Sequence, residues 1–167
     1  TLFFATALSA QVAIGKSSIS SPAVSLEFYD NADNTRGIIL PWVTSTAAVT
    51  GAVNGTIVYN TADRKVYVKY ASGWRDLSVD NTGAVNTTLQ DSLTDQDTAK
   101  VLIGGDPATD TTPGILVLAD TNKAMVLPKV ASPHLNIVNP SPGMMVYDTT
   151  KKQLAVFNGT VWSFWKP

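Results

Sequence analysis

The same series of motifs occurs twice in this sequence of 167 residues. The matching segments follow one another in the same order: residues 37–43 (GIILPWV) and 124–130 (AMVLPKV), residues 55–61 (GTIVYNT) and 143–149 (GMMVYDT), and the tryptophans Trp74 and Trp162. Self-similarity of this kind marks repeated structural units. We therefore expect two copies of one unit: a first repeat over residues 11–77 and a second repeat over residues 101–167, joined by a polar linker over residues 78–100.

Alternation of apolar and polar residues predicts β-strands in both repeats. Residues 65–70 (KVYVKY) place Val66 and Val68 on one face, and residues 153–158 (QLAVFN) repeat the pattern. Further strands are predicted at residues 24–29, 37–40, 56–60 and 74–77, and again at 115–118, 124–127, 144–148 and 162–165. The expected fold class is all-β, with two tandem antiparallel meanders forming sandwich-like repeats. Because a unit of about 65 residues buries only a small core, the repeats are expected to pack together or share strands.

The composition excludes several classes of function. A hydrophobic fraction of 44% with 15% charged residues describes a packed globular chain and not a disordered one. A net charge of −1 offers no positive field for nucleic acid. The absence of cysteine excludes disulfides and thiolate metal sites.

Residues 1–10 (TLFFATALSA) form an apolar segment that ends in small residues. Such a segment is typical of the end of a secretory signal peptide, and it is too short to span a membrane. Three interpretations follow. The segment is removed on export, it is retained and buried because its exposure to water is costly, or it is not part of the natural protein. The first two indicate a secreted, extracellular or cell-surface protein.

The motifs resemble a repeat found in secreted and cell-surface proteins of Bacteroidota. That repeat has a Gln-Val-Gly-Ile-Gly start, a Gly-x-x-Val-Tyr-(Asn/Asp)-Thr motif and an Asn-Gly-x-x-Trp ending. The segments that carry the resemblance are 11–15 (QVAIG), 55–61, 143–149, 158–162 (NGTVW) and, in degraded form, 70–74 (YASGW). The resemblance extends over residues 12–77 and 102–166. It implies an adhesin-like or fibre-like protein and brings no catalytic residues with it.

Residues suited to catalysis or metal binding are sparse. His134 is the only histidine, so neither a zinc site nor a cysteine–histidine pair can be assembled. No Gly-x-Ser-x-Gly motif supports a serine nucleophile. The oxygen-rich residues 30–34 (DNADN) offer ligands for calcium, but they fit an ordinary turn better. We predict neither an enzyme nor a cofactor.

The four tryptophans divide into two classes. Trp74 and Trp162 occupy matching positions, so they are expected to close the apolar core of each repeat. Trp42 and Trp165 have no aromatic counterpart in the other repeat, and they are the expected contact residues for a glycan.

Four short triplets resemble the Asp-(Ser/Thr)-apolar pattern of O-glycosylation used in this phylum. The candidate acceptor residues are Ser92, Thr98, Thr111 and Thr149. Because a triplet is short, chance matches are common in a threonine-rich chain.

Open sheet edges and small cores favour self-association by β-strand addition. The first hypothesis is a structural subunit of an extracellular filament or surface fibre that polymerises head to tail. Its expected donor residues are Leu2, Phe3, Phe4 and Leu8. Its expected acceptor groove is lined by Ile57, Val58, Val66, Val68, Val146 and Val156. The alternative is a cell-surface adhesin or glycan-binding module that does not polymerise and contacts glycans or other cells.

Overall fold

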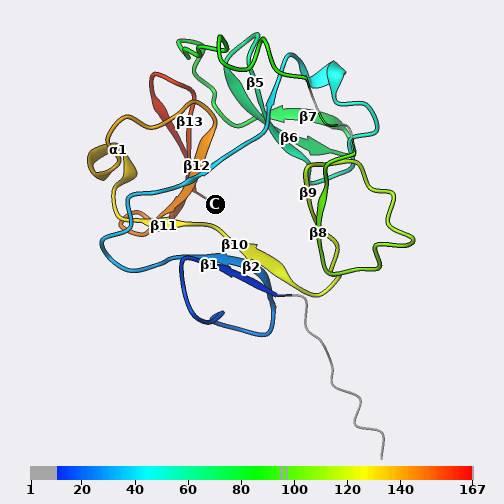
Figure 1. The fold of residues 1–167 in the computed structure, drawn as a ribbon. Helices are drawn as coiled ribbons and strands as arrows, with labels where there is room; N and C mark the ends of the chain where they lie inside the picture. Colours follow the sequence, from blue (N-terminus) through cyan, green and yellow to red (C-terminus); the bar gives the residue numbers. More distant parts are fainter. Residues whose placement is uncertain (1–10, 95, 97, 167) are drawn as a thin grey trace, which may run out of the picture.

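The computed structural model describes residues 11–94, 96 and 98–166 of the chain. Within them the regular secondary structure is nearly all β-strand, which confirms the all-β fold class (Figure 1). The only helical elements there are η1 (Thr46–Ala48) and α1 (Pro133–Asn136). The strands form four sheets in the described part of the chain.

Each repeat contains the predicted antiparallel meander. The strands of the two meanders are β5 (Ile57–Asn60), β6 (Lys65–Tyr70) and β7 (Gly73–Asp76), and β12 (Met144–Asp148), β13 (Gln153–Phe157) and β14 (Trp162–Trp165). The pairing is the same in both: Tyr59 is opposite Val66, and Tyr147 is opposite Leu154. The motifs therefore repeat in three dimensions as well as in sequence.

Parallel strand pairs complete both repeats. The pairs are β1 (Val12–Ile14) with β2 (Val24–Phe28), β4 (Trp42–Val43) with β5, β8 (Val101–Ile103) with β9 (Leu116–Leu118), and β11 (Lys129–Val130) with β12. The sheets that contain the meanders are therefore mixed, and the sheets β1-β2-β10 and β8-β9 are parallel, whereas the alternation predicts antiparallel sheets. The short strands β4 and β11 follow Leu-Pro pairs, and both prolines keep a carbonyl that accepts a ladder hydrogen bond, from Tyr59 N–H and from Tyr147 N–H at 2.9 Å each.

The two repeats exchange strands, as their small size predicts. The strand β3 (Ile38–Ile39) of the first repeat pairs with β12 of the second, and β10 (Ala124–Val126) of the second repeat pairs with β2 of the first. Neither repeat is a closed unit, because each completes a sheet of the other.

The larger hydrophobic core lies between the repeats. Its buried residues are Leu40, Tyr59, Val66 and Leu77 from the first repeat with Met145 and Val156 from the second. A second cluster belongs to the second repeat alone, and Trp162 packs against it as predicted for a core residue. The buried Tyr59 and Val66 of the first meander therefore share their core with the second repeat.

The predicted linker begins as part of the packed structure. Ser78 and Gly83 are buried, and Val85 packs against the core shared by the repeats. From Asn86 onward most of the described linker residues are exposed. The first part of the linker therefore acts as a spacer between the repeats, and its second part is a surface connection.

A buried carboxylate holds the turn after β12. Asp148 is fully buried, and its Oδ1 accepts hydrogen bonds from the backbone N–H groups of Ser132 at 3.1 Å and Thr150 at 2.9 Å. Burial acts to raise the pKa of Asp148, but the backbone donors of Lys151, Ser132 and Thr150 and the amide of Gln153 outweigh it and leave the pKa below its ordinary value of 3.8. The first repeat has Asn60 at this place, and its side-chain oxygen accepts from Ala62 N–H at 3.0 Å.

Replacing Asp148 with asparagine is expected to cost about 1–2 kcal/mol of stability at pH 7, because the charge-assisted bonds become neutral ones. Since the folded-state pKa is lowered, the carboxylate's contribution is complete above pH 3.8 and is lost as the pH falls through the folded value. The difference between Asp148→Asn and the unchanged chain in urea unfolding should therefore shrink below pH 3.8. Asp91→Asn, in the exposed linker, is the control; a constant difference at every pH would contradict this role for Asp148.

Candidate self-association interface

Two tryptophans connect the repeats in opposite directions. The Trp42 indole N–H donates to the Pro142 carbonyl oxygen at 2.9 Å, and the Trp165 indole N–H donates to the Leu77 carbonyl oxygen. Both rings are half-buried and pack against the shared core. Neither tryptophan is fully exposed, and the polar edges of both are satisfied within the chain, while their role as glycan contacts stays a prediction.

Tyr59 is the most deeply buried aromatic residue of this interface. Its side chain is 0% exposed, and its hydroxyl donates to the Asn158 carbonyl oxygen at 2.8 Å. Burial raises the pKa of the Tyr59 hydroxyl to about 12, so the proton is retained for this bond. The equivalent Tyr147 in the second repeat is 36% exposed. The same residue type is thus buried in one repeat and left at the surface in the other.

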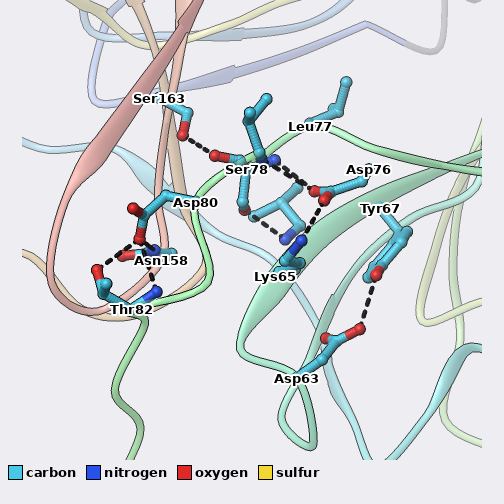
Figure 2. A network of polar contacts seen from close by, with 12 residues as sticks. Asp63, Lys65, Tyr67, Asp76, Leu77, Ser78, Asp80, Thr82, Asn158 and Ser163 are labelled. Atoms are coloured by element: carbon cyan, nitrogen blue, oxygen red, sulfur yellow. Dashed lines mark hydrogen bonds and ion pairs between the residues drawn. The ribbon is translucent and has the colours of Figure 1, made fainter.

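Polar contacts extend the interface along the start of the linker (Figure 2). The Asn158 amide donates to Asp80 Oδ1 at 3.0 Å, and the Ser163 hydroxyl donates to the Ser78 carbonyl oxygen. The Ser78 hydroxyl accepts from Val66 N–H at 2.7 Å, which ties the linker back to β6. The hydroxyl and N–H of Thr82, together with Asn158, hold the pKa of Asp80 below its ordinary value. The linker therefore joins both meanders.

Glycines allow the two backbones to approach closely. A Cβ at Gly37 would lie 2.6 Å from Val146 Cγ1, and one at Gly143 would lie 2.8 Å from Tyr59 Cβ. A Cβ at Gly159 would lie 1.7 Å from the Ala84 carbonyl oxygen. Each of these contacts joins the first repeat or the linker to the second repeat, so the spacing of the interface requires residues without side chains.

The interface is head to tail and not two-fold symmetric. In sequence, β10 is the equivalent of β3, and β5 is the equivalent of β12. A two-fold symmetric interface would therefore pair β10 with β5, just as β3 pairs with β12. Instead β10 lies on β2. The first repeat thus presents one face to its partner, and the second repeat presents a different one.

The predicted acceptor groove lies largely inside this interface. Val58, Val66, Val146 and Val156 are buried in the single chain, whereas Ile57 and Val68 are partly exposed. The role of these six residues in accepting a strand stays a prediction. The donor residues Leu2, Phe3, Phe4 and Leu8 lie outside the described residues.

The remaining candidate residues lie apart from the interface contacts. Ser92, Thr98, Thr111 and Thr149 are exposed. His134 stacks edge-on against Phe164 with ring centroids 5.7 Å apart. Asp30 forms ion pairs with Lys16 at 3.2 Å and Lys129 at 3.3 Å, so its carboxylate is already paired with cations of the chain. Within the described ranges, no cluster of three metal-ligating side chains occurs, and no helix has the length and apolar character to cross a membrane.

Sequence reasoning missed the linker residues of this interface. Ser78, Asp80 and Gly83 lie in a polar stretch that reads as an ordinary connection, yet they contact one or both meanders. A signal was present in Trp42 and Trp165: a large aromatic residue without a counterpart in the other copy lies where the two repeats contact one another through different faces.

Comparison with known families gives one match. A family described as a phage tail like trimerisation region matches residues 106–166, which is most of the second repeat. No curated protein and no solved structure matches the chain. The match supports a structural, fibre-like role with self-association, and its description names no reaction.

Proposed function

We propose that the chain is a structural subunit of an extracellular filament or surface fibre whose molecules join by adding β-strands to one another's sheets. The observation that carries this proposal is the exchange of β3 and β10 between the repeats. The sequence builds its sheets from strands of different units, and a head-to-tail contact of that kind extends when further units are added.

Two further observations support the proposal. The family match over residues 106–166 has a description of self-association. The signal-like residues 1–10 and the resemblance to surface proteins of Bacteroidota favour a secreted or cell-surface location. The alternative of a glycan-binding module predicts that Trp42 or Trp165 is exposed. Both indoles donate hydrogen bonds within the chain, so the fibre subunit is the better-supported function.

In its finer form, the proposal assigns residues 1–10 as an added strand, with Leu2, Phe3, Phe4 and Leu8 supplying the apolar contacts. A chain beginning at Gln11 should fold as the full chain does but associate at least tenfold more weakly, because the apolar area of that strand is lost. Sedimentation velocity over a concentration series, with negative-stain microscopy, measures this.

The control for this deletion replaces Phe3 and Phe4 with serine in a chain of full length, which keeps the backbone and removes the apolar side chains. Equal association of all three proteins would contradict the donor role of residues 1–10. A full-length chain that stays monomeric at high concentration would contradict the fibre proposal itself.

A further inference from the structure

We propose that the contact between the two repeats recurs between molecules, with β10 of one chain pairing with the β5 edge of a second copy of this chain. This inference rests on the proposed function and names a contact between molecules in addition to the proposed strand of residues 1–10. It follows from comparing each half of the duplicated structure with the other, since three of the surfaces through which the repeats contact one another have a counterpart that is open among the described residues.

The first open position is the edge of β5. In the second repeat, β3 covers the start of β12: Ile39 is opposite Met144, and Leu40 N–H donates to the Gly143 carbonyl oxygen at 3.1 Å. In the first repeat, the equivalent Gly55 and Thr56 have no strand on that side among the described residues. Gly143 is buried and a Cβ there would meet Tyr59, whereas Gly55 is exposed and a Cβ there would meet nothing within 4 Å.

The second open position is the outward face of the second repeat. An apolar hollow at this face is lined by Met125, Val126, Leu127, Lys129 and Tyr147. These are the sequence equivalents of Ile38, Ile39, Leu40, Trp42 and Tyr59. Apart from the exposed Ile39, which pairs with β12, that first-repeat set packs in the core shared with the second repeat. The hollow in the second repeat is therefore equivalent to the face by which the first repeat contacts the second. No other repeat covers it within the described part of the chain.

The third open position is the edge of β9. Its equivalent β2 carries β10 on one edge, and Leu26 in β2 is 1% exposed. By its register with β8, Leu116 in β9 corresponds to Leu26, and it is 47% exposed. When β10 of one molecule pairs with β5 of a second molecule, β3 of the second molecule would lie against β9 of the first. This contact would repeat the pairing of β10 with β2 within the chain.

The contact between molecules is expected to be weaker than the one within the chain. Lys129 stands where the first repeat has Trp42, and Leu77 stands where the second repeat has Trp165. The contact between molecules therefore lacks both tryptophans and their hydrogen bonds to the carbonyl oxygens of Pro142 and Leu77. Association between chains should be reversible, while the two repeats stay together.

Engineered cysteines test this pairing in a chain that has none of its own. By equivalence with the Ile39–Met144 pair, Val126 of one chain should face Thr56 of the next, at a distance that a disulfide can bridge. The full-length variant carrying Thr56→Cys and Val126→Cys, oxidised at a concentration where the unaltered chain associates, should give covalent multimers on a non-reducing gel. The matched control, Ile39→Cys with Met144→Cys, should close within the chain and give only monomer.

A second variant tests the same face without cross-linking. Tyr147 is the equivalent of Tyr59, which is buried in the contact between the repeats. Tyr147→Glu would place a charge in the proposed contact between molecules, so it should weaken association at least tenfold. The far-ultraviolet circular dichroism should be unchanged. Leu89→Glu, in the exposed linker, is its control and should have no effect.

The outcomes separate the inference from the proposed function. An associating chain whose Thr56/Val126 cysteines stay reduced, or close within one molecule, would overturn the inference and leave the fibre role intact. If the Ile39→Cys, Met144→Cys control does not form its disulfide, β3 does not pair with β12 as the structure has it. The inference, which extends that pairing to a second molecule, would then be overturned. A monomeric unaltered chain would overturn both proposals.

Discussion

Replacing Tyr59 with alanine is expected to lower the free energy of unfolding by about 4 kcal/mol, the usual cost of removing a large buried aromatic side chain. The ring lies in the core shared by the two repeats, and its hydroxyl is a donor to the Asn158 carbonyl oxygen. Urea unfolding followed by tryptophan fluorescence measures the change.

The internal duplication supplies the control for this prediction. Tyr147→Ala removes the same side chain from the equivalent position of β12, where it is 36% exposed, and should cost less than about 1 kcal/mol. Equal losses for the two variants would mean that the interface between the repeats contributes little to stability. A loss confined to Tyr59→Ala would identify the contact between repeats as the source of the energy.

The second large effect is expected at Gly159. Its φ of +102° disfavours any side chain, and a Cβ would lie 1.7 Å from the Ala84 carbonyl oxygen. Because Ala84 belongs to the linker between the repeats, Gly159→Ala must push the linker away from β13 or distort the turn. We expect a loss of about 3 kcal/mol, from backbone strain and overpacking together.

Gly73→Ala separates these two contributions. Gly73 has a φ of +127°, but a Cβ there would meet nothing within 4 Å. It should therefore show the backbone cost alone, about 1 kcal/mol. Thermal unfolding by calorimetry compares the two variants, and a Gly73→Ala loss as large as that of Gly159→Ala would show that the approach of the linker is not what requires glycine at 159.

The local pattern of the sequence predicted the meanders well and the long-range pairing poorly. Alternation at residues 65–70 and 153–158 gave β6 and β13 almost to the residue, since a strand with one buried face shows its period directly. The two-residue strands β4 and β11 are too short to show a period. Their pairing depends on the carbonyl groups of Pro41 and Pro128, which no apolar pattern reports.

The exchange of strands between repeats was predictable only in outline. The size of one repeat required a shared core, but β3 and β10 have equivalent sequences and different partners. Their choice depends on which sheet edge the rest of the chain leaves within reach. Likewise, the roles of Trp42 and Trp165 follow from the relative position of the repeats, which the sequence of one repeat does not contain.

The head-to-tail contact gives any assembly built from it a direction. One terminal molecule would expose the start of β5, and the molecule at the opposite terminus would expose β10 and Tyr147. Growth could then differ in rate at the two termini, and a protein that recognised only one of these surfaces would stop elongation there and leave the other terminus free. A fibre of this kind could be anchored through one terminus while it lengthens at the other.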